Sequence, residues 1–147
     1  MSTHEPKAFE RTTPQNEASG EFKGKITRGG DPHDFKAKFL YLDRQPGSVR
    51  FFGVDNEFAD PTPEDPFNRE GIEVRLIKPN AQKTEYTIGD GDVYASYAGP
   101  SGEEIPTQSG TVTYHQNDRD NSVNGRIQLT LSGQTTVDLI YLLNTQE

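Results

Sequence analysis

Apolar and polar residues alternate with a period of two in the C-terminal third of the chain. Over residues 122–132, an apolar residue or a glycine occupies every second position, and polar residues occupy the positions between them. A shorter segment, residues 111–115, alternates in the same way. This alternation is typical of half-buried β-strands, because successive side chains of a strand point to opposite faces of the sheet. The polar residues 116–121 separate the two segments and favour a turn, so the sequence predicts a β-hairpin over residues 109–132.

The same alternation recurs along most of the chain and predicts further strands. These cover residues 21–27, 34–42, 49–54, 72–76, 84–88, 93–97 and 135–143. The connections between them are too short for parallel crossovers, which predicts antiparallel pairing. We therefore expect an all-β fold, an antiparallel β-sandwich of about nine short strands, since many short strands at regular spacing are typical of sandwiches. A closed β-barrel is the alternative, because the period does not distinguish the two.

The chain divides into a short tail and one domain. Residues 1–19 are polar, contain Pro6 and Pro14 and show no periodicity, so we expect a flexible N-terminal tail. Residues 20–147 carry the strand pattern and are predicted to form a single β-sandwich domain, which is the usual size for one hydrophobic core.

Part of the chain resembles small uncharacterised bacterial β-sandwich proteins. The resemblance covers residues 84–132 and is carried by Val93-Tyr94-Ala95-Ser96-Tyr97, Ser109-Gly110-Thr111-Val112-Thr113 and Asn121-Ser122-Val123-Asn124-Gly125. In those proteins a strand ending in a tyrosine precedes an S-G-T-[VIL]-T segment, and an acidic turn then leads to [VI]-x-G-x-[FL]. Where that pattern often places a bulky aromatic residue, this chain has Arg126-Ile127. The resemblance implies the sandwich fold and implies no activity, cofactor or site residue.

The charge and composition exclude several classes of function. The formal net charge is −8 and no basic stripe offsets it, which disfavours binding to nucleic acid and to anionic membranes. The chain has no cysteine, which excludes disulfides and thiolate metal sites. The longest apolar run, residues 139–143, is far too short to insert into a membrane, and the N-terminus has no apolar segment of signal-peptide length. We therefore expect a cytoplasmic protein.

Two acidic segments are the candidates for a cation site. Asp55, Glu57 and Asp60 lie in the proline-rich loop that follows the third predicted strand, and Asp118 and Asp120 lie in the hairpin turn. Clustered carboxylates can supply the oxygen ligands that Ca²⁺ prefers. Neither segment has the spacing of an EF-hand loop, so the sequence favours solvated loops, with weak Ca²⁺ binding as the alternative.

Two aromatic residues are candidates for contact with a ligand or partner. Phe52 and Tyr94 fall on the polar-facing sides of their predicted strands. Aromatic side chains exposed on a sheet can anchor a protein interface or stack on a ligand. If a second layer covers them, they belong instead to the core.

These observations predict a non-catalytic binding or protein-interaction module with an unknown protein partner or small ligand. One alternative is a lipocalin-like barrel that carries a small apolar ligand, and another is a cation-dependent binding module. An enzyme with a site formed by Asp55, Asp60 and His33 is a further hypothesis. We do not expect catalysis, because no nucleophile motif or dinucleotide fingerprint is present in the sequence.

Overall fold

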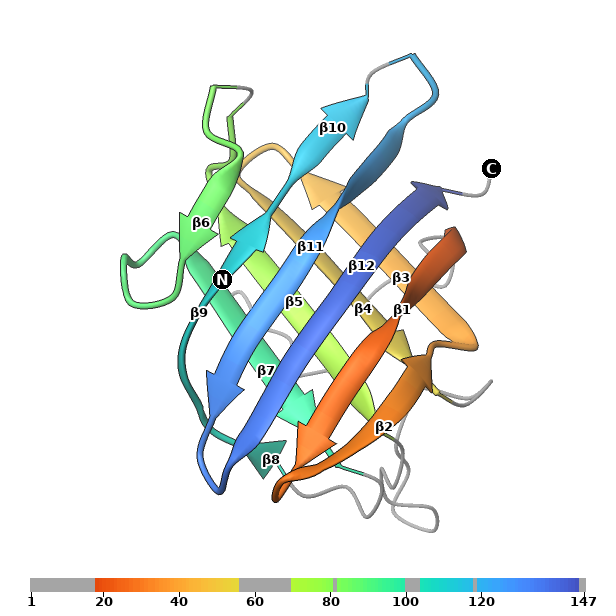
Figure 1. The fold of residues 1–147 in the computed structure, drawn as a ribbon. Helices are drawn as coiled ribbons and strands as arrows, with labels where there is room; N and C mark the ends of the chain where they lie inside the picture. Colours follow the sequence, from red (N-terminus) through yellow and green to blue (C-terminus); the bar gives the residue numbers. More distant parts are fainter. Residues whose placement is uncertain (1–17, 56–69, 81, 100–103, 118, 146–147) are drawn as a thin grey trace, which may run out of the picture.

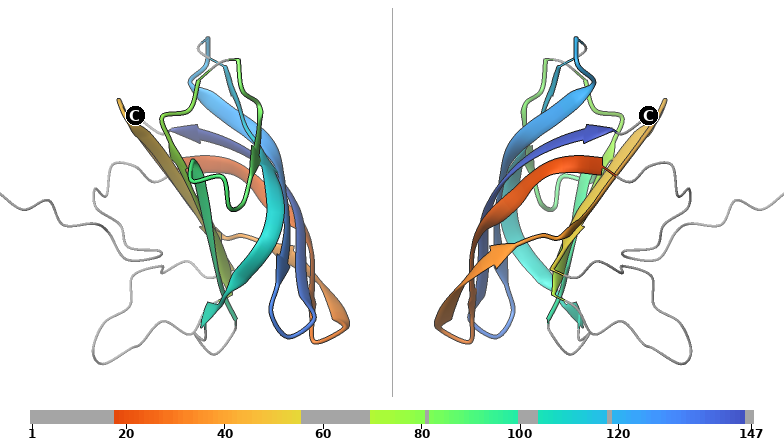
Figure 2. Two further views of the ribbon diagram at one scale, coloured as in Figure 1. Left: turned by 90° about the vertical axis from the view of Figure 1, so that its left-hand side faces the viewer. Right: turned by 90° about the vertical axis from the view of Figure 1, so that its right-hand side faces the viewer.

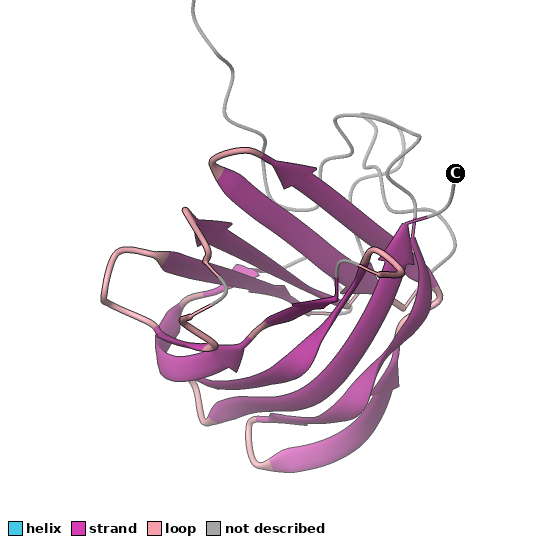
Figure 3. Ribbon diagram, turned by 90° about the horizontal axis from the view of Figure 1, so that it is seen from above, coloured by secondary structure: helices cyan, strands magenta, loops and turns pink. Residues whose placement is uncertain are grey.

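A computed structural model describes residues 18–55, 70–80, 82–99, 104–117 and 119–145. The described residues form only strands, turns and loops (Figures 1 and 3), so no helix long and apolar enough to cross a membrane is present in this part of the chain. One sheet has the order β2 (Asp31–Lys36), β1 (Ala18–Arg28), β12 (Thr135–Thr145), β11 (Ser122–Leu131), β9 (Thr107–Thr113) and β6 (Glu85–Thr87), with β10 (His115–Asn117) also paired to β11. The other sheet has the order β3 (Phe39–Gln45), β4 (Ser48–Val54), β5 (Gly71–Ile77), β7 (Val93–Ala98) and β8 (Glu104–Ile105).

The two sheets pack face to face as a β-sandwich (Figure 2), and every strand pair is antiparallel. This confirms the predicted fold class, and the described strands do not close into the alternative barrel. The predicted hairpin is formed by β9 and β11, in which Val112 lies opposite Ile127. The described residues form twelve strands where about nine were predicted, because β8 and β10 are additional short strands and the segment predicted over residues 34–42 forms two strands, β2 and β3.

The first described strand begins within the segment predicted as a tail. Ala18 and Ser19 belong to β1, where they pair with Thr145 and Asn144 of β12. Backbone pairing to the last strand therefore extends the domain into the predicted tail. The polar side chain of Ser19 gives no apolar signal, which explains why the alternation missed this end of the strand.

The segment predicted as one strand over residues 34–42 is divided between the two sheets. The backbone N–H of Ala37 donates to the Phe22 carbonyl of the first sheet at 2.9 Å, and that of Lys38 donates to the Val54 carbonyl of the second at 2.8 Å. The chain changes sheets between these two residues. As a result, Phe35 faces the core in β2, whereas Leu40 and Leu42 face it in β3.

Aromatic rings fill the space between the sheets. Phe51 of β4 lies 4.5 Å from Tyr141 of β12, measured between ring centroids, and Phe22 of β1 contacts both rings. Gly53 makes room for this contact, because a Cβ at that position would lie 2.7 Å from the Phe22 ring. Only 30% of the residues are apolar. The large aromatic rings offset this low fraction, because each ring buries a large apolar area.

Candidate functional site

The outward side of the seven-stranded sheet carries two exposed apolar side chains. Ile140 and Leu142 occupy alternate positions of β12, and their exposed fractions are 51% and 43%. Lys23 and Arg126 lie opposite Ile140 on the two neighbouring strands, and Glu21 and Asn124 lie opposite Leu142. We call this surface the seven-stranded face and define it by Glu21, Lys23, Asn124, Arg126, Asp138, Ile140 and Leu142.

Ion pairs surround the two apolar side chains on the seven-stranded face. Arg126 donates two hydrogen bonds, at 2.9 and 2.8 Å, to the two carboxylate oxygens of Asp138. These bonds lower the pKa of Asp138 and raise that of Arg126. Lys23 pairs with Glu21 at 3.3 Å on the other side of Ile140. The charged groups therefore balance one another around an apolar centre.

Sequence reasoning did not identify Ile140 and Leu142. They belong to the apolar run of residues 139–143, in which Leu139, Tyr141 and Leu143 face the core. In a continuous apolar run no polar residue marks which side of the strand faces solvent, and such a run is also typical of strands that are buried on both sides.

Phe52 is not exposed, so the prediction of an accessible aromatic at this position is wrong. It does point outward from β4, but its exposed fraction is 0%. Its ring stacks on Tyr41 at a centroid distance of 4.8 Å and on Phe39 at 6.0 Å. The Arg50 guanidinium lies 5.3 Å from the centre of the Phe52 ring, and the same arginine forms a buried ion pair with Glu73 at 2.7 Å. Phe52 thus belongs to a second buried cluster.

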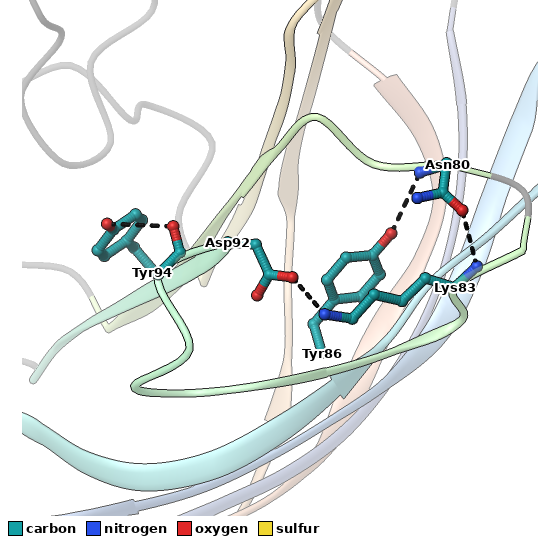
Figure 4. Close-up of polar contacts among 6 residues, drawn as sticks. Asn80, Lys83, Tyr86, Asp92 and Tyr94 are labelled. Carbon is teal, nitrogen blue, oxygen red and sulfur yellow. Dashed lines mark hydrogen bonds and ion pairs between the residues drawn. The ribbon is translucent and has the colours of Figure 1, made fainter.

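Tyr94 is exposed as predicted, with 55% of its surface accessible. Its hydroxyl lies 3.4 Å from the Gly91 carbonyl (Figure 4). Nearby, Lys83 extends over the Tyr86 ring and pairs with Asp92, and this hydrogen bond raises the pKa of Lys83. The role of Tyr94 in binding remains a prediction.

The two described carboxylates of the predicted cation site lie far apart. Asp120 accepts hydrogen bonds from the backbone N–H and the hydroxyl of Ser122, which lower its pKa. Asn121, the next residue in this turn, lines the same pocket as Val49 of β4, which places the turn beside the start of β4. Asp55 follows the opposite end of β4, about 20 Å away along an extended strand.

The other predicted ligands, Glu57, Asp60 and Asp118, lie outside the described residues. Among the residues that are described, no group of three or more histidine, cysteine or acidic side chains could hold a metal ion.

A partly buried polar cluster joins the two sheets at the end of the sandwich away from the hairpin turn. His33 of β2 places its Nε2 atom 2.8 and 2.9 Å from the two carboxylate oxygens of Glu70. The Tyr97 hydroxyl donates to the same carboxylate at 2.6 Å. Burial and this hydrogen bond raise the pKa of Tyr97. Burial, followed by the charge of Glu70, raises the pKa of the nearby Asp55.

This cluster brings together two residues of the hypothetical enzyme site, His33 and Asp55, around Glu70. Glu70 directly precedes β5 and lies 37 residues from His33 in the sequence. No local pattern relates the two positions, so only the packing of the sheets could reveal the contact. The arrangement connects the edge strand β2 of one sheet to β5 and β7 of the other.

Comparisons with protein-family models, with curated proteins and with solved structures found no match to this chain.

Proposed function

We propose that this chain is a non-catalytic protein-interaction module that binds its partner through the seven-stranded face. The observation that supports this most directly is the exposure of Ile140 and Leu142 side by side on a central strand. Protein interfaces commonly have an apolar centre within a polar rim, and a few central side chains dominate their binding energy. Lys23, Glu21 and Arg126 would form such a rim.

Strand pairing favours a partner that docks flat on the face. β12 is hydrogen-bonded to β1 along one edge and to β11 along the other, so its backbone is already paired. A partner would therefore contact side chains, in contrast to partners that add a strand to a free edge.

The charge of the face indicates what kind of surface would fit it. The outward-facing residues of β1, β2, β11 and β12 include Lys23, Lys25, Lys36 and Arg126, and also Glu21, Asp34 and Asp138. Local charge is thus nearly balanced although the chain carries −8. We expect a different protein with a near-neutral apolar patch, because two copies of this chain would repel each other through their net charge.

The alternative functions have less support from the geometry. A carrier of an apolar ligand would need a hollow interior, whereas Phe22, Phe51 and Tyr141 fill the space between the sheets. A cation-dependent module would need its carboxylates to converge, whereas Asp55 and Asp120 lie at opposite ends of β4.

The proposal is tested with the double variant Ile140→Thr, Leu142→Thr. Threonine suits a strand, and exposed substitutions change stability by no more than about 0.5 kcal/mol, so we expect an unchanged melting temperature. Proteins captured from a lysate of the host by the wild-type chain would be identified by mass spectrometry, and the purified partner would then be titrated in biolayer interferometry. The double variant should bind at least about tenfold more weakly.

The matched control is Tyr94→Thr, which removes the third large hydrophobic side chain that is exposed in the described part of the chain and that lies on the other sheet. If the interface is the seven-stranded face, this control should bind the partner as the wild type does, and that result would contradict the sequence-based prediction that Tyr94 contacts a partner. Equal binding by the wild type and the double variant would refute the proposal, as would an equal loss in the Tyr94 control. If the wild-type chain forms a dimer in analytical ultracentrifugation and the double variant does not, the partner is a second copy of this chain and not a different protein.

A further inference from the structure

A pocket opens at the end of the sandwich where the β3–β4 turn faces the β10–β11 hairpin. Its volume is about 410 Å³, and Figure 3 views the molecule from this end. The residues that line it are Arg44, Gln45, Pro46, Val49, Pro79, Gln116 and Asn121. This volume lies within the range of small-molecule sites, about 300–1,000 Å³.

Arg44 places a positive charge at the open end of the space between the two sheets. It continues the row of Leu40 and Leu42, which face the space between the sheets, and it lies opposite Val49 in the strand pair. The Val49 side chain is 3% exposed and provides an apolar floor. Arg44 itself is partly exposed, and within the described part of the chain it forms no ion pair.

The lining indicates the chemistry of a ligand. Of the described lining residues, Arg44 is the sole charged one, and a guanidinium matches the geometry of a carboxylate through two parallel hydrogen bonds. The amides of Gln116 and Asn121 add donors and acceptors around it. The Gln45 side chain instead donates a hydrogen bond to Oδ1 of Asp43 at 2.7 Å, so Gln45 lines the pocket with an amide that is already engaged. Tyr114 donates a hydrogen bond to Oε1 of Gln116 at 3.1 Å and thereby orients that amide.

We propose that this pocket binds a small organic carboxylate. The carboxylate pairs with the Arg44 guanidinium, and the apolar part of the ligand lies against Val49, Pro46 and Pro79. A single guanidinium suits one carboxylate, whereas phosphate sites usually combine several donors such as a second cation or a helix N-terminus. The site is separate from the seven-stranded face, so this inference does not depend on the proposed function.

The test uses benzoate as the probe and benzamide, which is uncharged but nearly the same shape, as its control. Each would be titrated into the ¹⁵N-labelled full chain and followed by two-dimensional NMR. We expect benzoate to shift the amide signals of Gln45, Val49, Gln116 and Asn121 in a saturable manner, with a Kd of about 0.1–10 mM. Benzamide should cause less than about a tenth of this effect at the same concentration, since it lacks the charge that pairs with Arg44.

Two variants separate the pocket from general charge effects. Arg44→Gln should weaken benzoate binding at least about tenfold, because the charge-assisted pair is lost. Arg126→Gln removes a positive charge from the seven-stranded face and should leave the titration unchanged. The inference is refuted if benzoate shifts none of these signals, if benzamide shifts them equally, or if Arg44→Gln binds as the wild type does. The comparison of the two probes on the wild-type chain decides the question even if Arg44→Gln does not fold.

Discussion

Tyr97 donates a 2.6 Å hydrogen bond to Oε2 of Glu70, and both residues are buried. His33 contacts the same carboxylate from the opposite sheet. A buried charged group must be hydrogen-bonded, or its loss of hydration destabilises the fold. The contact between Tyr97 and Glu70 therefore stabilises the end of the sandwich at which β2, β5 and β7 meet.

Replacing Tyr97 with phenylalanine should destabilise the protein by about 1.5–3 kcal/mol, because a hydrogen bond to a buried charged group is lost. Chemical denaturation of the wild type and the variant measures this difference. Tyr94→Phe is the matched control: its hydroxyl is exposed and should contribute less than about 0.5 kcal/mol. Equal stabilities for the two variants would show that the Glu70 contact does not stabilise the fold.

Replacing Arg50 with methionine should destabilise the protein by about 3–5 kcal/mol, because Glu73 would keep a buried charge without this partner. The side chains of Arg50 and Glu73 are 5% and 6% exposed. The double variant Arg50→Met, Glu73→Leu should recover most of the loss, since no buried charge remains in the pair. Urea denaturation measures all three proteins.

The exposed ion pair between Lys25 and Asp34 provides the comparison for the buried one. Its side chains are 68% and 87% exposed, so Lys25→Met should cost less than about 1 kcal/mol. If Arg50→Met were no more harmful than Lys25→Met, burial of the Arg50–Glu73 pair would not have the effect we assign to it.

Gly53→Ala should destabilise the fold by about 1–3 kcal/mol, because the added methyl group would overlap the Phe22 ring that packs across the sheets. Gly47→Ala is the control, since a Cβ there would meet nothing within 4 Å. Differential scanning calorimetry should show a lower melting temperature for the first variant only. An unchanged melting temperature for Gly53→Ala would mean that Phe22 can move aside without loss.

The ion pair between Arg126 and Asp138 should make stability depend on pH in the acid range. The hydrogen bonds from Arg126 hold the pKa of Asp138 in the folded chain below its ordinary value of 3.8. The stabilisation is therefore fully present above pH 3.8 and is lost as the pH falls through the folded-state pKa. Because both side chains are 51% exposed, solvent screens the pair and the effect should be small.

The measurement for this pair compares the wild type with Asp138→Asn in urea at neutral and acid pH. The difference in unfolding free energy should favour the wild type at neutral pH and vanish in acid. With Arg126→Gln as the background, the same comparison should show no such pH dependence. If the difference persisted in that background, another group would be its cause.

Much of the fold can be predicted from local pattern because a strand imposes a period of two on the side chains that it buries. The hairpin of β9 and β11 follows from this rule, as does the side of β7 on which Tyr94 points. The change of sheet between Ala37 and Lys38 could not be predicted in this way. Residues 34–42 contain no glycine, proline or polar turn that would mark a break, although residues 39–42 are all apolar. The chain crosses by forming one backbone hydrogen bond to each sheet.

The candidate sites were less predictable, because each depends on contacts between distant strands. Phe52 has the pattern of an exposed residue but lies buried against Tyr41 and Phe39. Ile140 and Leu142 have the pattern of buried residues but lie exposed. In both cases the sequence determined on which side of its strand a residue points, since alternation is a local property of the backbone. Only the tertiary structure decided whether that side is covered, because burial depends on which distant segments pack there.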